Sequence, residues 1–454
     1  MNIVVAGAGA GKTTSMAEVV ISRLHNMETK GKIIYVISYT NSARDRIKEK
    51  IIKNHGSIPS QVKVETIHSF LLREVIYPFH HLIYGHILKS ASHIPLSSNH
   101  IFKAKKKKEL KDSNIIHVED VTKNAKYILC GKSSDTVKIK SKRENALRMI
   151  SRYLDSIFVD ESQDMDDAFS EVLAMLDHHN IGVNLIGDPK QDLRNRGAFR
   201  EIISGDIPVK YLPDNHRCPI ELVDFSNSYI AEEERQFSIK EGGILRFVME
   251  SNCDIKKEVE SGLYDLVYIY QKNARFITHK QDQISKANHL FYELKVLTTK
   301  SSIIKEIYTD QHAYVLLRKT INAIKTNVNT NAIFRGLEKD LSIVMDSPDK
   351  GKIGGAIGEY RSMLSDEPGI LVSSIDGVKG LEGDNCLFIV STQLAPYLFK
   401  EDVDQNKMVN YLYVALTRSR RNLTIMVTRE VEKKYGHQHI YQQFKNLGIE
   451  EIRP

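Results

Sequence analysis

The N-terminal residues 2–21, NIVVAGAGAGKTTSMAEVVI, join a short apolar run to a loop with alternating glycines and then to a helical pattern. The run Asn2–Val5 predicts a buried parallel strand, and Ser15–Ile21 continues with helical character. Glycines let backbone N–H groups turn inward around phosphates, and the positive end of the helix dipole adds to the attraction. The order of strand, glycine loop and helix therefore predicts a phosphate-binding loop in an α/β fold.

We expect this loop to bind a nucleotide through backbone and side-chain groups. Lys12 would reach the β- and γ-phosphates, and the Thr13 hydroxyl would occupy a position on Mg²⁺. The strict pattern has glycine where Ala6 stands, and the alternative interpretation is a glycine-rich turn at the end of a strand. The expected nucleotide-binding residues of the loop are Ala6, Gly7, Ala8, Gly9, Ala10, Gly11, Lys12, Thr13 and Thr14.

A second apolar run, Ile157–Val159, leads directly into the acidic pair Asp160 and Glu161. Acids at the carboxyl end of a strand project into the crevice where an α/β sheet binds its ligand. Asp160 would hold Mg²⁺, through water, and Glu161 would orient and deprotonate the attacking water. The alternative is a surface acid pair at the start of a helix, but the strand before it and the phosphate loop upstream favour metal and water chemistry.

A third apolar run, Val183–Ile186, ends in the segment Gly187–Gln191. Gln191 could hydrogen-bond either the γ-phosphate or the attacking water, and so sense whether hydrolysis has occurred. The transferred phosphoryl group also needs positive charge that a single phosphate loop does not supply. Arg217 and Arg418 are the candidates, because each stands in a motif-like segment, although a single arginine is usually a solvated surface residue.

In this order, the segments resemble the motifs of superfamily 1 helicases of the UvrD/Rep/PcrA group, over most of the chain. The family's phosphate loop also begins with alanine, as at Ala6, and Lys379–Glu382 and Val414–Arg418 are similar to its last two motifs. The resemblance implies that ATP and Mg²⁺ are the cofactors and that Glu382 contacts the ribose. It also implies that Arg217 and Arg418 reach the γ-phosphate across a cleft between two domains.

The resemblance also implies contact with single-stranded DNA. Ser38–Ala43 is similar to a family segment whose aromatic residue stacks on a base, and Thr66–Phe70 to one that touches the DNA backbone. The residues assigned to nucleic acid in this way are Tyr39, Thr40, Asn41, Thr66, His68, Ser69 and Asp376. For Tyr39, the alternative is core packing beside the apolar run Ile33–Ile37.

The sequence departs from the family in three places, of which the first concerns adenine selectivity and the other two the nucleic-acid side of the pattern. The sequence starts at the phosphate-loop strand, so we expect the family's upstream glutamine segment, which recognises adenine, to be missing. The third motif has Asp192–Asn195, one residue short, where the family has an aromatic that stacks on DNA, and the sequence contains no Trp. Asp376 stands where the fifth motif usually has histidine.

We expect two RecA-like domains with parallel sheets and with ATP at their interface. The first would comprise residues 1–72 and 150–212, with a small inserted subdomain at 73–149, and the second residues 213–454. A basic run at 103–108 in the inserted subdomain is either a solvated helix face or a surface that follows a phosphate backbone.

Val315–Arg318 resembles the strand that opens the core of the family's second domain. About 50 residues then remain before the apolar run Ile370–Val372, and they include the turn-rich segment Ser347–Gly351. We therefore expect the family's large insertion in the second domain to be absent, or reduced to a loop and a short helix.

Composition agrees with this interpretation. A chain of 454 residues can hold about three domains, and a net charge of +7 is compatible with nucleic acid. The four cysteines form no Cys-x-x-Cys pair, which argues against a zinc site and suggests a reducing compartment. No apolar run approaches the ~20 residues needed to span a bilayer, so we expect a soluble, cytoplasmic protein with no membrane partner.

The sequence thus predicts an ATP-dependent translocase or helicase, 3′→5′ by resemblance, acting on single-stranded or tailed duplex DNA in repair or anti-phage defence. The alternative is an ATP-hydrolysing sensor or regulatory subunit that controls a partner nuclease and unwinds little by itself. In its small size the chain is similar to the compact UvrD-like subunits of Gabija-type anti-phage systems. A P-loop kinase or transport ATPase would leave the late motifs at Glu382 and Arg418 unexplained.

Overall fold

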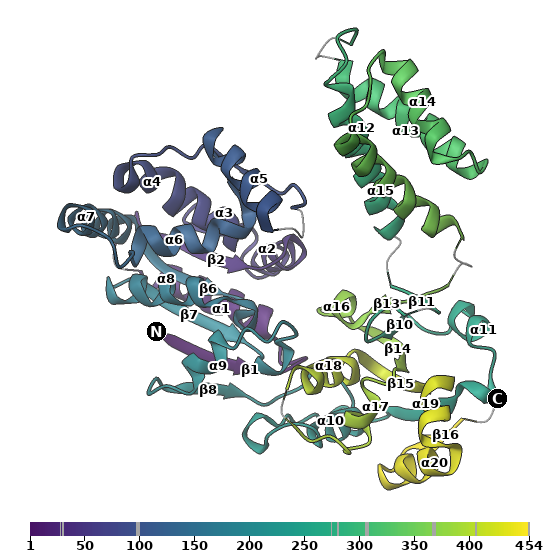
Figure 1. The fold of residues 1–454 in the computed structure, drawn as a ribbon. Helices are drawn as coiled ribbons and strands as arrows, with labels where there is room; N and C mark the ends of the chain where they lie inside the picture. The colour runs from purple at the N-terminus through teal and green to yellow at the C-terminus, as the bar shows by residue number, and fades with distance from the viewer. Residues whose placement is uncertain are drawn as a thin grey trace.

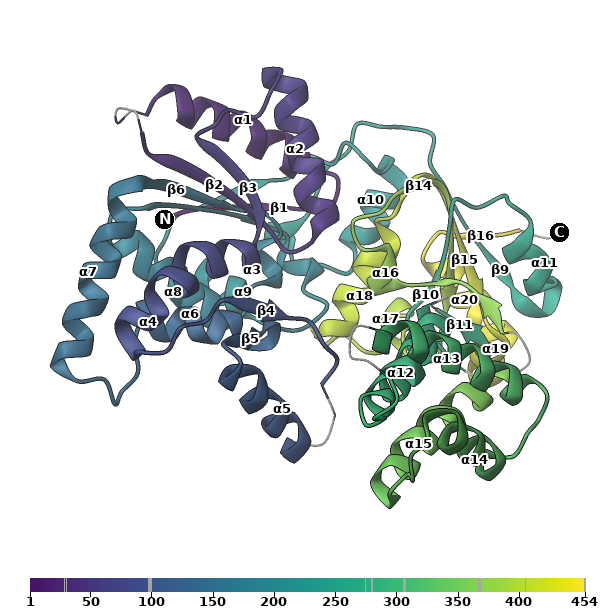
Figure 2. The same ribbon diagram turned by 90° about the horizontal axis from the view of Figure 1, so that it is seen from above.

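Two parallel sheets, each with six strands, form the framework of this computed structural model (Figures 1 and 2). The structure describes residues 1–27, 29, 31–96, 100–273, 275–278, 281–304, 308–365, 369–404 and 406–452. The fold class expected from the sequence, two RecA-like α/β domains, is confirmed. None of the helices in these ranges combines the length and apolar character that crossing a membrane requires.

The first sheet has the strand order β3-β2-β6-β7-β1-β8, and all of its pairings are parallel. Its inner strands β2 and β6 are buried on both faces, as is usual for a parallel sheet covered by helices, while the edge strands β3 and β8 are partly exposed. All strands of this sheet lie within the expected segments 1–72 and 150–212. They are β1 (Asn2–Ala6), β2 (Ile33–Ser38), β3 (Val62–Thr66), β6 (Leu154–Val159), β7 (Gly182–Gly187) and β8 (Val209–Leu212).

Helices cover both faces of this sheet and give it two apolar cores. On one face, α1 (Lys12–His25) and α2 (Asn41–His55) bury residues such as Val20 and Ile51 against β2 and β3. The opposite face packs against α8 (Asp167–His178), α9 (Ala198–Ile203) and the inserted segment. This segment shares the core of the sheet, since Val121 and Leu147 belong to the same buried cluster as Ile157.

The inserted segment is helical, with one small two-stranded parallel sheet. Its first turns after α3 (Ile67–Phe70) are π-helical, at Leu71–Ile76. The elements that follow are α4 (Tyr77–Tyr84), β4 (Ser90–Ser92), α5 (His100–Asp112), β5 (Ile115–His117), α6 (Val121–Leu129) and α7 (Val137–Tyr153). The basic run falls on α5, which has no buried residue.

The second sheet has the strand order β13-β10-β14-β15-β9-β16 and is also parallel throughout. Its strands are β9 (Ile244–Met249), β10 (Leu266–Ile269), β13 (Ser373–Ser374), β14 (Gly383–Val390), β15 (Ser419–Val427) and β16 (Glu450–Glu451). The helices around it are α10 (Ile220–Asn227), α11 (Ile255–Glu260), α16 (Ile375–Val378), α17 (Ala395–Leu398), α18 (Lys407–Leu416), α19 (Arg429–Tyr435) and α20 (His437–Asn446).

A four-helix subdomain extends from the second sheet, between the paired strands β11 (Phe276–Ile277) and β12 (Ile370–Leu371) (Figure 1). It consists of α12 (Gln281–Thr298), α13 (Thr309–Lys325), α14 (Thr330–Leu341) and α15 (Ser347–Ser365). It has its own apolar core, which includes Leu294, Leu337 and Ile357. The expectation that the second-domain insertion is absent or reduced to a loop and a short helix is therefore wrong.

The structure also corrects the assignment of Val315–Arg318 as a strand. This segment lies inside α13, where Leu316 and Leu317 are buried and Val315 is exposed, as on an amphipathic helix. The turn-rich segment Ser347–Gly351 forms the first turns of α15. Proline is tolerated there because the first N–H groups of a helix have no intrahelical partner.

Candidate functional site

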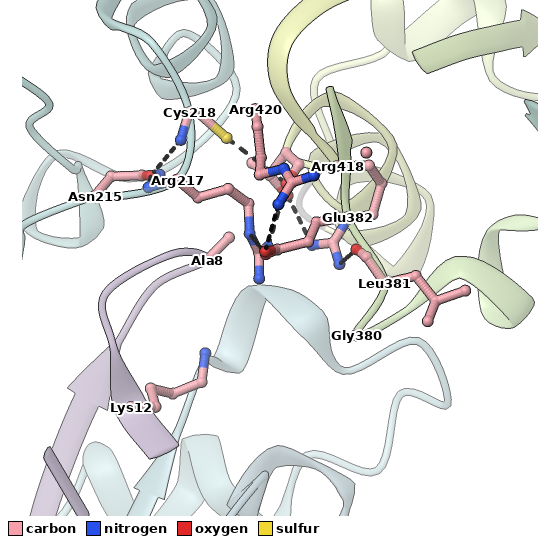
Figure 3. A network of polar contacts seen from close by, with 12 residues as sticks. Ala8, Lys12, Asn215, Arg217, Cys218, Gly380, Leu381, Glu382, Arg418 and Arg420 are labelled. Carbon is pink, nitrogen blue, oxygen red and sulfur yellow. Dashed lines mark hydrogen bonds and ion pairs between the residues drawn. The ribbon is translucent and has the colours of Figure 1, made fainter. Parts of the chain in front are cut away.

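The carboxyl ends of β1, β6 and β7 meet at one edge of the first sheet, because the three strands are parallel and adjacent. This edge therefore gathers the glycine loop after Ala6, the acidic pair after Val159 and the segment that begins at Gly187. The second domain faces this edge with Arg217, Glu382 and Arg418 (Figure 3). Segments spread over the sequence thus form one cleft between the two domains.

The glycine loop has the backbone conformation that a phosphate cradle needs. Gly9 and Gly11 adopt left-handed φ angles of 74° and 72°, which a side chain would disfavour. Gly11 caps α1 without a side-chain bond to the first-turn amides, so these donors can bind an anion. The Lys12 ammonium lies 3.2 Å from the carbonyl oxygens of both Ala6 and Gly7, above the loop.

The pKa values of the two acids in this pair are shifted in opposite directions. Asp160 is 3% exposed, and Glu161 follows it with a left-handed φ of 53° and donates its N–H to Asp160 Oδ1 at 3.0 Å. Burial, followed by the charge of Glu161, raises the pKa of Asp160 to about 7. Burial also acts to raise the pKa of Glu161, but Lys12 and Lys379 overcome it and leave that pKa lowered. Glu161 is thus ionised, while the pKa of Asp160 stays raised although the charges of Lys12 and Arg46 act to lower it.

This donor set fits Mg²⁺, which prefers oxygen ligands and retains several waters. The Thr13 hydroxyl and the Asp160 carboxylate are the candidate protein ligands. Among the described residues, no three or more His, Cys, Asp or Glu side chains gather to hold a metal unaided. An ion here would therefore take its remaining ligands from phosphate oxygens and water.

Two buried residues to which the sequence analysis gave no role connect the acidic pair to the third motif. Gln163 donates to Glu161 Oε2 at 2.6 Å and accepts from the N–H of Asp188 at 2.9 Å. Asp188 in turn accepts from Gln191 Nε2 at 2.8 Å. Gln191, expected to sense the γ-phosphate, is therefore oriented by a chain of bonds that begins at Glu161. Gln163 and Asp188 both lie within motif segments of the sequence, and this position is what could have indicated a role for them.

The two candidate arginines lie together, but in different surroundings. Arg217 donates from Nε to Glu382 Oε2 at 2.6 Å. Arg418 is 1% exposed, and its described hydrogen bonds go to Val414 O, Leu381 O and Thr417 Oγ1. Burial, and then the charge of Arg217, lowers the pKa of Arg418. The Arg418 guanidinium is thus buried and bonded to oxygen atoms of its own domain, while that of Arg217 is ion-paired with Glu382. Both lie on the second-domain side, opposite Lys12 (Figure 3).

The second half of the chain also forms hydrogen bonds with the tip of the phosphate loop. The Ala8 N–H donates to the Tyr413 hydroxyl, and the Ala8 carbonyl accepts from Gln236 Nε2, both at 3.0 Å. The His216 N–H donates to the Gly9 carbonyl at 3.0 Å. A Cβ on Gly9 would lie 2.5 Å from Asn215 Oδ1, so the close approach requires glycine. Tyr413 and Gln236 had no expected role.

Further contacts join the domains beside the cleft. The Lys379 ammonium lies 2.7 and 2.8 Å from the two carboxylate oxygens of Asp164. Arg46 donates to the Gly380 carbonyl, and the Asn410 amide donates to the Asp192 carbonyl, both at 2.9 Å. The motif segments of the two domains are therefore bonded to each other directly.

The residues assigned to nucleic acid fall into two groups. In the first domain, Thr40 caps α2, which begins at Asn41, by accepting from the Ala43 N–H at 3.1 Å. The Thr66 and Ser69 hydroxyls lie 2.9 Å apart, and Thr66 accepts from the Ser69 N–H. Thr40, Thr66 and Ser69 thus have local structural contacts, and Asn41 lies in the first turn of α2. Their contact with a nucleic-acid strand stays a prediction.

Tyr39 and His68 lie in one electrostatic environment, since both are influenced by Asp166 and Arg196. Tyr39 is half-buried against the first core, and its enclosed hydroxyl has no hydrogen-bond partner among the described residues. Burial raises the pKa of Tyr39 and lowers that of His68. Asp376 is exposed on the second domain and accepts from the Tyr411 hydroxyl at 2.9 Å.

Comparison with known proteins finds similarity for the first domain and for the whole chain. A family model described as an AAA domain matches residues 1–195. The whole chain is similar to the Gabija protein GajB of Bacillus cereus strain VD045, with 24% identity over 509 residues that cover 99% of this chain and 97% of that protein. The resemblance to UvrD/Rep-like helicases drawn from the motifs, including its Gabija-type form, is confirmed.

Two further matches are helicases by name. The probable DNA helicase II homolog of Mycoplasma pneumoniae is 25% identical over 321 residues, which cover 56% of this chain and 43% of that protein. The solved structure of an arterivirus nonstructural protein 10 helicase matches with a TM-score of 0.37 and 11% identity, over 94% of this chain and 59% of that chain. This chain therefore spans less than two thirds of the length of either.

Proposed function

We propose that this protein is an ATP-hydrolysing translocase of the helicase type that moves along single-stranded DNA, in the 3′→5′ direction by its family resemblance. The observation that carries the proposal is the placement of Arg217 and Arg418 opposite the phosphate loop and Lys12. A γ-phosphate in this cleft would contact positive groups from both domains. Hydrolysis would therefore change the attraction between the domains, which is what a stepping motor needs.

Each residue of the cleft has a chemical task in this proposal. The Lys12 ammonium and the amides at the start of α1 bind the phosphates of ATP. Glu161 is ionised and is held by Gln163, so its carboxylate can orient the attacking water and accept its proton. Gln191 contacts the γ-phosphate or the water. Bound Mg²⁺, held by Thr13 and Asp160, would neutralise the developing phosphate charge.

The ion pair between Arg217 and Glu382 would rearrange when ATP binds in the cleft. In the structure, the Arg217 guanidinium is held in a 2.6 Å ion pair with Glu382. ATP offers the arginine a phosphate and offers Glu382 a ribose hydroxyl. The exchange of partners would draw the guanidinium toward the transferred phosphoryl group, where positive charge lowers the barrier.

An ATP-hydrolysing regulatory subunit that controls a partner nuclease is the second candidate. Its support is the match to the Gabija protein GajB, which covers 99% of this chain. The weak nucleic-acid side of the pattern supports it too: Asn195 stands in the region of the missing aromatic, and Asp376 is an exposed acid. In this case a partner protein, rather than a DNA strand, would be coupled to the cleft.

The test is a steady-state ATPase assay of the purified chain with and without a single-stranded oligonucleotide. We expect hydrolysis that depends on Mg²⁺ and is stimulated by the oligonucleotide. Hydrolysis without stimulation, together with co-purification of a nuclease that restores stimulation, would favour the regulatory subunit. The absence of hydrolysis under all of these conditions would contradict both candidates.

A further inference from the structure

Lys190 in the third motif is a buried lysine to which the proposed function gives no task. It is 3% exposed and lies in the short 3-10 helix Pro189–Gln191, directly after the carboxyl end of β7. Its ammonium lies 3.1 Å from Asp188 Oδ1, 3.6 Å from Glu234 Oε2 and 5.2 Å from the centre of the Tyr413 ring. Burial of a charge costs free energy unless the charge is paired. The Lys190 charge is therefore held by groups from both halves of the chain.

Asp188 uses both of its carboxylate oxygens on neighbouring groups. Oδ1 accepts from the Lys190 N–H at 3.2 Å, in addition to the ion pair. Oδ2 accepts from Gln191 Nε2 at 2.8 Å and from the Tyr413 hydroxyl at 3.2 Å. Burial acts to raise the pKa of Asp188, but the charges of Lys190 and Lys12 overcome it and leave the pKa lowered. Asp188 is therefore ionised although it is fully buried.

An ionised Asp188 determines which end of the Gln191 amide faces it. A carboxylate only accepts hydrogen bonds, so the amide presents its NH2 group to Asp188 and turns its carbonyl oxygen away. This Oε1 atom has no hydrogen-bond partner among the residues that the structure describes. It is not enclosed, since in that part of the chain the enclosed side-chain atoms without a partner are the hydroxyls of Tyr39 and Ser391. Gln191 thus keeps one acceptor that an incoming molecule can reach.

We propose that Lys190 is a positioning residue for ATP hydrolysis, which acts through Asp188 to hold the Gln191 carbonyl oxygen available to the attacking water. This inference rests on the proposed function. It selects the water over the γ-phosphate as the partner of this oxygen, because a carbonyl accepts a hydrogen bond from water but not from an anionic phosphate. Glu161 and Gln191 would then each accept from one hydrogen of the same water. Lys190 affects this water only through Asp188 and Gln191.

The test is single-turnover ATP hydrolysis by the full chain, with ATP affinity measured in parallel. Lys190→Met removes the charge and keeps an unbranched side chain, while Lys210→Met makes the same change at an exposed position of β8. We expect Lys190→Met to hydrolyse bound ATP at least ~10-fold more slowly, with less than about twofold change in affinity, because the loss falls on the chemical step. Lys190→Arg should recover most of the rate. Equal rates in Lys190→Met and Lys210→Met would overturn the inference.

A double variant separates positioning from folding. Removal of one partner of a buried ion pair leaves an uncompensated charge, whereas removal of both partners is often nearly neutral. Asp188→Asn/Lys190→Met should therefore fold, as measured by circular dichroism, and should take the place of Lys190→Met if that variant is unfolded. It should still hydrolyse slowly, because an amide at position 188 can bond either end of the Gln191 amide. Recovery of the wild-type rate would mean that Lys190 only compensates a buried charge, and would contradict the inference.

Gln191→Ala tests the route by which Lys190 acts. If the effect passes through Gln191, adding Lys190→Met to Gln191→Ala should slow hydrolysis by less than about twofold further. A further loss as large as the one in the wild-type background would show that Lys190 acts by another route, and the inference would be wrong.

Failure of this inference can be distinguished from failure of the proposed function. A wild-type chain that hydrolyses no ATP would refute both. Hydrolysis by the wild type that is lost in Glu161→Gln but unchanged in a folded Lys190→Met protein would refute the inference alone. The inference is supported if Lys190→Met is slow, Lys190→Arg recovers, and the two losses at Lys190 and Gln191 do not add.

Discussion

The hydroxyl oxygen of Tyr413 lies 3.0 Å from the amide nitrogen of Ala8 at the tip of the phosphate loop. Tyr413 is fully buried, and its hydroxyl also lies 2.9 Å from Gln236 Oε1 and 3.2 Å from Asp188 Oδ2. The helix that carries Tyr413 ends directly before Thr417 and Arg418. One phenol therefore connects the phosphate loop, the third motif and the helix that presents an arginine to the cleft.

Replacement of Tyr413 by phenylalanine should weaken this connection without creating a cavity. The buried Ala8 N–H would lose its partner, and an unsatisfied buried donor costs about 1–3 kcal/mol. We expect a lower melting temperature and a several-fold fall in ATP turnover, measured by calorimetry and steady-state kinetics. Tyr314→Phe, at a 61% exposed tyrosine of α13, is the matched control. Equal behaviour of the two variants would show that the Tyr413 hydroxyl has no coupling role.

Lys12→Ala and Glu161→Gln should each reduce ATP turnover by at least ~100-fold. Lys12 supplies a charge that the loop amides cannot replace, and Glu161 acts on the water. Glu161→Gln should still bind ATP, because its loss falls on the chemical step. Glu18→Gln, at an exposed position of α1, should leave turnover unchanged. Near-normal turnover in either cleft variant would mean that the site is assigned wrongly.

Tyr39 offers a test with two substitutions of opposite effect. If its ring stacks on a base, Tyr39→Ala should weaken single-strand binding by about 1–3 kcal/mol. Tyr39→Phe keeps the ring and removes a hydroxyl that has no described partner, so it should retain binding without loss of thermal stability. If the alanine variant is unfolded by circular dichroism, or if Tyr39→Phe loses binding, the stacking role is wrong.

The motif segments allowed much of the fold and the cleft to be predicted from the sequence. Parallel strands must place the residues after Ala6, Val159 and Gly187 at one edge, so their proximity follows from the strand assignments alone. The four-helix subdomain was missed because the apolar run at Val315 was read as a strand. Short apolar runs do not distinguish a buried strand from one turn of an amphipathic helix.

The residues that join the domains could not be predicted in the same way. Gln236 lies outside every motif, and its contact with Ala8 spans 228 positions of the sequence. Such a contact depends on how the two domains dock, which no local pattern encodes. Tyr413 lies within the last motif, but its apolar neighbours in α18 are also buried. From the sequence alone, packing in the core therefore explained a tyrosine at this position equally well.

We expect the purified chain to hydrolyse ATP without processive unwinding. The third motif has no aromatic to hold a base between steps, and opening a duplex costs about 1.4 kcal/mol of stacking for each base-pair step. The four-helix subdomain shows that a second-domain insertion is present, so the expectation rests on the third motif. The measurement is displacement of one strand from a 3′-tailed duplex under single-turnover conditions. Efficient displacement by the chain without a partner would contradict the expectation.

The central claim is that one ATP is bound and hydrolysed between the two domains, and Arg418 tests it most directly. The measurement is single-turnover ATP hydrolysis by Arg418→Ala and Arg418→Lys, with ATP affinity measured in parallel and Arg421→Ala as an exposed control. We predict a fall of ~10³-fold in the hydrolysis rate of Arg418→Ala, a much smaller change in affinity, and partial recovery in Arg418→Lys. Unchanged hydrolysis in a folded Arg418→Ala protein would contradict the claim.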